Sequence, residues 1–488
     1  MTQNQLEKYL WGAATLLRGT IDAGDYKQYI FPLLFFKRIC DVYDEEFERA
    51  LADSDGDMEY AAFAEHHHFQ VPGQAHWNKV RETTTHVGMA LQEAMRAIEQ
   101  ANPDTLYGIF GDASWTNKDR LSDAILINLI EHYSQHKLSL SHVPDDKLGN
   151  AYEYLIKEFA DDSGHTAAEF YTNRTVVKLM TLIMDPQPGE SVYDPTCGSG
   201  GLLLNCALHL KEEGKEYRTL KLYGQEINLL TSAIARMNMF MHGIEEFSIV
   251  RGDTLANPAF LHNDALKTFN VILANPPYSI KAWDQKSFAN DPYGRNLWGT
   301  PPQGCADYAF QQHIQKSLDT KNGRSVSLWP HGVLFRDAEA EMRRKMIEED
   351  LVECVIGLGP NLFYNSPMEA CLLVTKTNKA PSRRGKILII NAVKEVRQDK
   401  SIAFLEDKHI EKIFEAFTQF ESQDNFAALI SAEEVLANKG NLSVSLYVQP
   451  EKEDENPVLP FDEAFRNWEE SGKSLQLSMR ELFQTLEN

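Results

Sequence analysis

The chain has 488 residues, of which 43% are hydrophobic and 24% charged, the composition of a globular protein with room for two or three domains. Its formal net charge of −23 at pH 7 argues against a protein that holds nucleic acid mainly by its own contacts to phosphate. The polar start is not a signal peptide, and no apolar run approaches the roughly 20 residues that span a bilayer, so we expect a cytoplasmic protein without membrane contact.

The acidic charge leaves two interpretations open. Either the chain is an enzyme of small molecules, or it acts on nucleic acid with a partner that supplies much of the grip. The cysteines are scattered without CxxC spacing, which predicts reduced thiols and neither a disulfide framework nor a zinc site. They are Cys40, Cys197, Cys206, Cys305, Cys354 and Cys371.

Residues 1–160 predict a mostly helical domain. Apolar residues recur at helical spacing in "LEKYLWGAATLLRG" and "YIFPLLFFKRICDVY", and a helical pattern returns further along. The polar stretch 52–80 predicts a loop, in which His66, His67 and His68 stand side by side. Three adjacent histidines cannot all face one ion from regular structure, so we interpret them as a surface cluster and expect no metal site.

Residues 161–400 change in character, because short runs rich in β-branched residues alternate with helical stretches. These runs are "SVYDP", "LKLYGQEI", "FSIVRGD", "NVILANPP", "RSVSLWP", "LVECVIGL", "CLLVTK" and "KILIINA". Strands separated by helices predict an α/β fold with a doubly wound sheet of seven to eight strands. Residues 401–488 contain the amphipathic runs "FLEDKHIEKIFEAFTQF" and "SLQLSMRELFQTLEN", and we expect them to form a helical tail for subunit assembly.

The first of these strands leads into a glycine-rich turn and a helix in "SVYDPTCGSGGLLLNCALHL". Gly198, Ser199, Gly200 and Gly201 allow a tight turn in which the backbone approaches a ligand at the start of the helix. Asp194 precedes the turn and repels phosphate, and the lysine–serine pair of an ATP-binding loop is absent. The turn therefore predicts a ligand with a cationic end rather than a dinucleotide or ATP.

Acidic residues also follow the next two strands. Glu226 is the last residue but one of the run "LKLYGQEI", near the strand end where dinucleotide-binding folds place a carboxylate on ribose hydroxyls. Asp253 follows the next strand in "RGDTL" and is placed to reach an adenine amino group. With Asp194 near a cationic end, these residues predict a site for S-adenosylmethionine, whose sulfonium needs no phosphate cradle.

The fourth strand ends in the unusual run Asn275, Pro276, Pro277 and Tyr278. An exocyclic amine of a nucleobase is a poor nucleophile, because its lone pair is delocalised into the ring. The Asn275 side-chain oxygen and the Pro276 carbonyl can draw its hydrogens out of plane, and the prolines add no competing N–H. Tyr278 offers a face for a base taken out of its helix. The alternative is a strand-terminating turn with a packed tyrosine, which the upstream cofactor motif disfavours.

Two motifs resemble those of DNA amino-methyltransferases. "DPTCGSGG" is similar to their first motif, and "EFYTNRTVVKLM" (169–180) is similar to their additional cofactor motif, in which an aromatic–threonine pair opens a helix at the methionine end of the cofactor. Asn173 stands at a capping position where many relatives have proline. The resemblance implies cofactor-binding roles for Glu169, Phe170, Tyr171, Thr172, Asn173 and Arg174.

Nearly the whole chain resembles the modification (methylation, M) subunit of type I restriction–modification systems. The likeness includes "LWGAATLLRGTIDAGDYKQYIFPLLFFKRI" near the start, "DPYGRNLWGTPPQGCADYAFQQHI" in the catalytic half and "NLSVSLYV" (441–448). It implies transfer of a methyl group from S-adenosylmethionine to adenine N6 in double-stranded DNA. It also implies assembly of two M subunits with one specificity (S) subunit, joined by a translocating restriction (R) subunit in the restricting complex.

Three alternatives stay open at this point. The acceptor can be another planar amine, namely cytosine N4, an RNA adenine or a protein glutamine. An architectural subunit that binds cofactor only as an assembly signal is a second alternative, although it predicts a degraded pocket. A standalone enzyme is the third, and it would need a recognition domain for which the short stretch between Asp194 and Asn275 leaves no room. The loop 281–304 is expected to close over the substrate.

Overall fold

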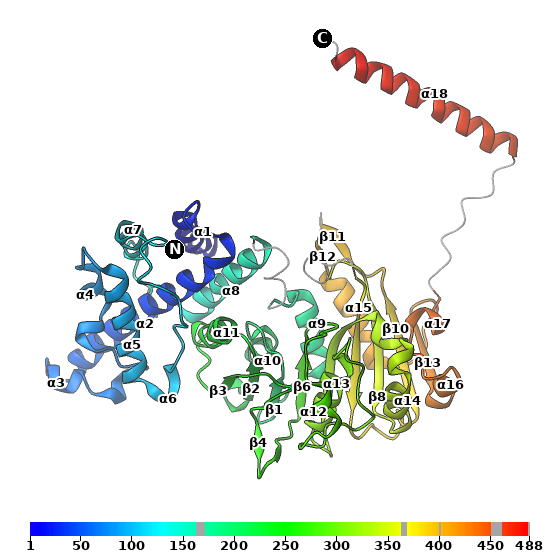
Figure 1. The fold of residues 1–488 in the computed structure, drawn as a ribbon, viewed down its shortest axis with the longest axis horizontal. Helices are drawn as coiled ribbons and strands as arrows, with labels where there is room; N and C mark the ends of the chain where they lie inside the picture. The colour runs from blue at the N-terminus through cyan, green and yellow to red at the C-terminus, as the bar shows by residue number, and fades with distance from the viewer. Residues whose placement is uncertain (163–170, 363–367, 400–401, 450–460, 487–488) are drawn as a thin grey trace. The chain divides into compact units, whose positions relative to one another are not determined.

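The computed structural model describes residues 1–162, 171–362, 368–399, 402–449 and 461–486. One compact unit, Met1–Val448, contains a helical N-terminal part and a central sheet, and a second unit, Gln449–Asn488, contains the helix α18, Phe461–Leu486 (Figure 1). No helix of the described residues combines the length and the apolar character that crossing a membrane requires. The six cysteines carry free thiols.

The N-terminal part consists of helices of very different length, joined by loops and short 3-10 turns. A capping box opens the first helix, because the Thr2 hydroxyl accepts the Gln5 N–H and the Gln5 side chain accepts the Thr2 N–H. The helices are α1 Gln3–Leu17, α2 Lys27–Asp53, α3 Met58–Ala61, α4 Trp77–Arg81, α5 Val87–Ala101, α6 Pro103–Leu106, α7 Asp123–Tyr133 and α8 Asp145–Asp162.

The core of this helical part continues into the sheet-containing part. Phe31 and Phe35 of α2 and Tyr152 of α8 are buried in the same apolar cluster as Ile234 and Met237 of α11, Leu229–Met241. The Tyr152 hydroxyl also donates a hydrogen bond to the Ile234 carbonyl at 3.2 Å. The helical part therefore packs directly on α11, a helix of the sheet-containing part.

The prediction of a surface cluster at residues 66–68 is wrong for His67 and is confirmed for His68, whose side chain is 48% exposed. The His67 side chain is fully buried. The His68 ring contacts two glutamates that are far apart in the sequence. Its Nε2 lies 3.2 Å from Glu245 and its Nδ1 contacts Glu46. Hydrogen bonds to Glu245 and Glu46 raise the pKa of His68 to about 10, although burial opposes them. The ring thus joins the helical part to the segment that leads into β3.

The eight predicted runs are all strands of one mixed sheet, whose order is β13-β10-β8-β9-β7-β6-β1-β2-β3. β1 is parallel to both β2 and β6, whereas β9 is antiparallel to β7 and β8. The strands are β1 Ser191–Asp194, β2 Lys221–Glu226, β3 Phe247–Arg251, β6 Val271–Ala274, β7 Arg324–Pro330, β8 Val352–Leu358, β9 Ala370–Lys376, β10 Lys386–Ala392 and β13 Ala427–Ser431. Two small hairpins pair β4 Leu261–His262 with β5 Ala265–Leu266 and β11 Arg397–Asp399 with β12 Ile402–Phe404.

The ninth strand corrects the prediction of a purely helical segment after residue 400. β13 pairs antiparallel with β10, so that Ile430 lies opposite Ile387. A run as short as "AALIS" does not reveal by periodicity whether it is strand or helix, and the open edge of β10 decides it. The helices of this segment in the first unit are α15 Asp407–Gln419, α16 Ala432–Ala437 and α17 Val444–Tyr447.

Helices cover both faces of the sheet, as a doubly wound fold requires. The consecutive β10 residues Leu388 and Ile389 belong to different apolar clusters, because side chains alternate across a strand. The remaining helices are α9 Arg174–Met184, α10 Gly201–Glu212, α12 Gln285–Ala289, α13 Asp307–Lys316 and α14 Ala340–Glu348. One cluster includes residues of α9, α10 and α15, and the other includes residues of α14, α16 and α17.

Candidate functional site

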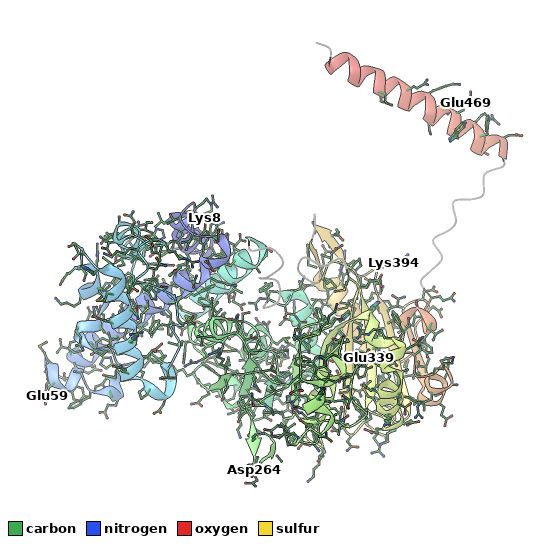
Figure 2. All side chains as sticks on the ribbon, viewed as in Figure 1. Lys8, Glu59, Asp264, Glu339, Lys394 and Glu469 are labelled. Carbon is green, nitrogen blue, oxygen red and sulfur yellow. The ribbon has the colours of Figure 1, made fainter. Side chains whose placement is uncertain are left out.

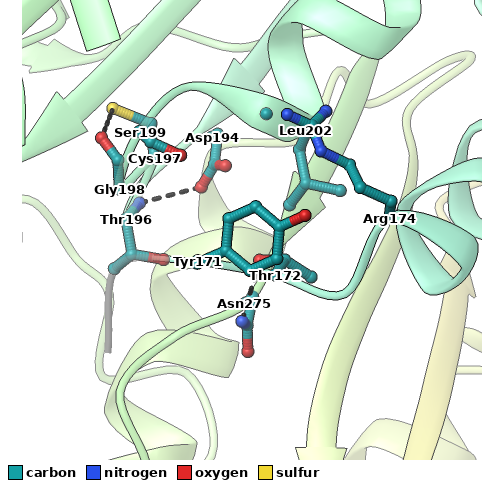
Figure 3. Close-up of a pocket in the computed structure, with 11 residues that line it drawn as sticks. Tyr171, Thr172, Arg174, Asp194, Thr196, Cys197, Gly198, Ser199, Leu202 and Asn275 are labelled. Carbon is teal, nitrogen blue, oxygen red and sulfur yellow. Dashed lines mark hydrogen bonds between the residues drawn. The ribbon is translucent and has the colours of Figure 1, made fainter. Parts of the chain in front are cut away.

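The carboxyl ends of three neighbouring strands carry the main predicted residues. β6, β1 and β2 are adjacent in the sheet, so Asn275 after β6, Asp194 at the end of β1 and Glu226 at the end of β2 come to one edge. Ligands of open α/β sheets bind outside this edge. Asp194 and Asn275 line one pocket together with Tyr171 and Gly198 (Figure 3).

The turn between β1 and α10 has a backbone that favours glycine. Gly198 and Gly200 have positive φ angles of 53° and 80°. A Cβ atom on Gly200 would lie 3.1 Å from Met239 Cε, and the Asn238 Nδ2 of the same helix, α11, donates to the Ser199 carbonyl at 3.1 Å. The turn is therefore held close against α11, while its residues also line the pocket.

Asp194 is a buried carboxylate with one unsatisfied oxygen. It is 1% exposed, its Oδ1 accepts the Thr196 N–H at 2.9 Å, and its Oδ2 has no hydrogen-bond partner within the described part of the chain. Burial raises the pKa of Asp194 to about 8, opposed by the Thr196 N–H and increased by the charge of Glu226. Such an oxygen favours a cationic ligand, because a nearby positive charge stabilises the ionised carboxylate.

Glu226 is tied to the glycine turn and faces a second space. Its carboxylate accepts the Gly198 N–H at 3.1 Å and the Asn228 N–H at 2.8 Å, and burial raises its pKa. It lines a cavity of about 300 Å³, within the usual range for small-molecule sites, which Asp253 also lines. Asp253 is exposed, and its Oδ1 accepts the Leu255 N–H at 2.9 Å.

The same cavity is lined by side chains that the sequence did not single out. Trp283 lies in the segment 281–304, which was predicted to be a loop over the substrate and which contains the short helix α12. Lys27 comes from the start of α2, and no motif connected the helical part with this cavity. Thr254, Ile280 and Phe310 are further examples.

The segment upstream of α9 divides into parts with different surroundings. Glu169 and Phe170 lie outside the described residues. Tyr171 and Thr172 line the pocket beside Asp194. They are followed by the residues that open α9.

Asn173 and Arg174 use their side chains in contacts within the protein. Asn173 is the N-cap of α9, since its Oδ1 accepts the Thr175 N–H at 3.1 Å, and its Nδ2 donates to the Ala403 carbonyl at 2.8 Å. Arg174 forms an ion pair with Glu153 of α8 and also lines the pocket. Asparagine at position 173 therefore serves as a helix cap.

Asn275 lines both the pocket and the larger cavity, and its amide is held at both ends. Its Nδ2 donates to Thr172 Oγ1 at 2.9 Å, and its Oδ1 accepts a hydrogen bond from the Tyr278 hydroxyl. Burial raises the pKa of Tyr278 well above its ordinary value, so this hydroxyl stays protonated and acts as the donor. Pro276 is buried, and Pro277 lines the cavity.

Asp194, whose Oδ2 has no hydrogen-bond partner in the described ranges, and Asn275, whose amide oxygen can accept hydrogen bonds from an amine, therefore line one pocket. The glycine turn and Glu226 connect the pocket with the larger cavity. Chemically, the site is suited to a cationic nucleoside on one side and an amino group on the other.

Comparison with known proteins gives matches over both parts of the chain. A family profile described as N-6 DNA Methylase matches residues 143–456, and one described as HsdM N-terminal domain matches residues 6–133. The chain is 31% identical over 487 residues to the type I restriction enzyme MjaVIII methylase subunit of Methanocaldococcus jannaschii, with 93% of this chain and 80% of that one covered. It is 28% identical to the type I restriction enzyme MpnII methylase subunit of Mycoplasma pneumoniae, with 93% and 91% covered.

Solved structures give the same result. The type I restriction-modification system methyltransferase subunit from Streptococcus thermophilus is 31% identical, with a TM-score of 0.79 over 92% of this chain and 100% of that one. The matches favour adenine N6 over cytosine N4, RNA adenine or protein glutamine as the acceptor. The chain therefore belongs to the N-6 DNA methylase family, among the methylase subunits of type I restriction enzymes.

Proposed function

We propose that this chain transfers a methyl group from S-adenosylmethionine to adenine N6 in double-stranded DNA, at the pocket that Asp194 and Asn275 share. The observation that carries the proposal is the buried Oδ2 of Asp194, which has no hydrogen-bond partner among the described residues. Asn275 lines the same pocket, so a place for a cation and an acceptor for an amine occur side by side.

The residues around the pocket fit the cofactor. When bound, S-adenosylmethionine supplies an electrophilic methyl group on a positively charged sulfur. Asp194 would balance the cationic end, and Glu226 and Asp253 at the larger cavity would contact the ribose and the adenine of the cofactor. The proposed cofactor site also includes Glu169, Phe170, Tyr171, Thr172, Asn173, Arg174, Gly198, Ser199, Gly200 and Gly201.

Asn275 and Pro276 would hold the acceptor amine. The bond from Asn275 Nδ2 to Thr172 leaves Oδ1 as the end of the amide that can accept a hydrogen from the amine. The Pro276 carbonyl would accept the second hydrogen, and Pro277 contributes no N–H that would compete. Holding both hydrogens in this way would make the nitrogen lone pair more available to attack the methyl group. The chain would therefore act mainly by positioning and electrostatics.

Tyr278 would change its hydrogen bond when the base enters. In the structure its hydroxyl donates to Asn275 Oδ1, the atom that the amine needs. We infer that the incoming adenine replaces this hydroxyl and packs on the face of the ring, because a base that has left the duplex is commonly stacked on an aromatic side chain. The hydroxyl would therefore close the acceptor until the base arrives.

Partners would supply the sequence specificity. We propose that two copies of this M subunit act with one S subunit in the cytoplasm, and that an R subunit joins them for restriction. The net charge of −23 supports a division of labour in which the S subunit makes much of the phosphate contact. The helix α18 carries exposed Phe465 and Trp468, which suit a helix that packs on a partner.

The test is transfer of radiolabelled methyl groups by the complex of this chain with its specificity subunit. Duplex DNA, RNA and protein are offered in parallel, and the isolated chain serves as the control. We expect label in duplex DNA alone, recovered as N6-methyladenine, and only when the specificity subunit is present. Label in cytosine, RNA or protein would overturn the proposed acceptor, and site-specific transfer by the isolated chain would overturn the role of the partner.

A further inference from the structure

The residue after Tyr278 has a strained backbone. Ser279 has φ 51°, in the left-handed region, where the Cβ of any residue other than glycine approaches a neighbouring carbonyl oxygen. It directly follows the run that holds Asn275 and Tyr278. A change in its backbone would therefore move both of the side chains that the proposed transfer uses.

One buried carboxylate holds this backbone in place. Asp307, the first residue of α13, is 0% exposed, and its Oδ1 accepts the Ser279 N–H at 2.7 Å. Next to it, the Ala306 N–H donates to the Ile280 carbonyl at 3.2 Å. The start of α13 thus contacts both residues that follow Tyr278.

The other oxygen of Asp307 is held by an arginine. Arg336, which follows β7, donates from Nη2 to Asp307 Oδ2 at 2.5 Å and from Nε to Glu339 Oε2 at 2.8 Å. Glu339 is 1% exposed and is labelled in Figure 2. Cys305, Asp307 and Glu339 are close enough to resemble the ligands of a metal ion. The Arg336 guanidinium already supplies the positive charge between the two carboxylates, so we interpret the group as a rigid support.

We propose that Asp307 is a positioning residue for methyl transfer, which keeps Ser279 left-handed and thereby aims Asn275 and Tyr278 at the base. The inference rests on the function proposed above and adds a residue to it. Asp307 lines neither the pocket of Asp194 nor the cavity of Glu226. It would therefore act through the segment 275–280 and not through contact with the cofactor. Asp307 belongs to α13 and its partner Arg336 lies after β7, so both residues of the support come later in the chain than Ser279.

The experiment uses Asp307→Ala, Ser279→Gly and the double variant in the complex with the specificity subunit. Removing the carboxylate should lower kcat about tenfold or more, the factor that corresponds to the left-handed penalty of a serine. Glycine adopts this conformation without that penalty, so Ser279→Gly alone should keep kcat within about twofold and should restore most of it in the double variant. The Kd for S-adenosylmethionine should change less than about twofold throughout.

The helical part offers a matched control. Asp123 Oδ2 accepts the N–H of His86 at 3.1 Å, and His86 is also left-handed, with φ 56°. Asp123→Ala should therefore loosen a similar contact far along the chain from the loop and leave kcat unchanged. A comparable loss of kcat in both variants would show a general loss of folding and would overturn the proposal.

Hydrogen exchange measures, without methyl transfer, whether Asp307 holds the backbone of residues 275–280. The peptide that spans residues 275–280 should exchange faster in Asp307→Ala than in the unsubstituted complex. Unchanged exchange, or a kcat that Ser279→Gly fails to restore, would overturn the positioning role. A complex that transfers no methyl group to duplex adenine would overturn the proposed function, whereas the exchange result would still decide whether Asp307 holds the loop.

Discussion

The cofactor side and the base side of the site differ in how complete they are. On the proposed cofactor side the glycine turn is packed against α11, Glu226 is bonded to the turn, and Asp194 Oδ2 has no hydrogen-bond partner among the residues that the structure describes. On the base side Asn275 is satisfied at both ends, by Thr172 and by Tyr278. In the proposed function, the first side would therefore receive the cationic cofactor without rearrangement, whereas on the second side the base would have to displace an internal hydrogen bond.

Removing the amide from the base side should have the largest effect. We expect Asn275→Ala to lower kcat by roughly 10²–10³-fold, the usual cost of losing one preorganised hydrogen-bonding group in a transition state. The Kd for S-adenosylmethionine should stay nearly unchanged, because the cofactor side is formed by other residues. Single-turnover transfer and calorimetry measure the two quantities, and a large loss of cofactor affinity would show that the two sides are not separate.

Neutralising the acid on the cofactor side should have the opposite signature. Asp194→Asn should weaken S-adenosylmethionine binding by about 10- to 100-fold, the range for a lost charge-assisted contact. Because the pKa of Asp194 is raised to about 8, affinity in the unsubstituted protein should increase as pH rises toward 8 and level off above it. The variant should lack this pH dependence. If calorimetry shows the same pH dependence of affinity in the variant and in the unsubstituted protein, Asp194 does not bind the cationic end of the cofactor.

The same shift has a consequence for stability. In the unfolded chain an aspartate ionises near pH 4, whereas in the folded protein Asp194 holds its proton until about pH 8. The folded state then binds more protons in this window, so the contribution of Asp194 to stability falls as pH rises from about 4 to 8. Asp194→Asn should therefore raise the unfolding temperature of the cofactor-free protein above pH 8, as measured by calorimetric scanning.

Tyr278 sharpens the comparison because its hydroxyl and its ring have separate roles. Tyr278→Phe removes the hydroxyl that occupies Asn275 Oδ1, so kcat should stay within about threefold and the KM for DNA should not rise. Tyr278→Ala removes the stacking face and should cost about 1–3 kcal/mol of transition-state stabilisation, measured as kcat/KM. A severe defect in the phenylalanine variant would contradict the displacement of the hydroxyl by the base.

The smallest effect is expected at Asn173. Asn173→Ala removes the cap of α9 and should reduce the free energy of unfolding by about 1 kcal/mol. Cofactor affinity should fall much less than in Asp194→Asn, because the asparagine side chain bonds Thr175 and Ala403. Denaturant titration and calorimetry on the same preparation measure the two free energies. If the free energy of cofactor binding changes more than the free energy of unfolding, Asn173 contacts the cofactor directly.

Much of the fold was predictable because its signals are local. Most of the eight strand runs are rich in apolar and β-branched side chains, and all eight are found in the sheet. β13 was missed because it becomes a strand only by pairing with β10. The burial of His67 was missed for a related reason, since the surface that covers it comes from residues distant in the sequence.

The candidate site shows the same division. The residue types at 194, 226 and 275 and their order along the chain predicted the cofactor and the amine, because each follows its own strand. Lys27 and Asp307 carried no such signal, since their positions depend on how α2 and α13 pack. The roles of the individual site residues stay predictions until the variants are measured.

By itself, the sequence determined which chemical groups stand at the ends of the strands, since strand runs, glycine turns and the Asn-Pro-Pro-Tyr run are all encoded by adjacent residues. Only the tertiary structure decided the hydrogen bonds of these groups. Within the described part of the chain Asp194 Oδ2 has no partner, whereas the Tyr278 hydroxyl donates to Asn275 and the Ser279 N–H donates to Asp307. The physical reason is that hydrogen bonding and desolvation of a buried group depend on every segment that surrounds it, and most of those segments are remote in the chain.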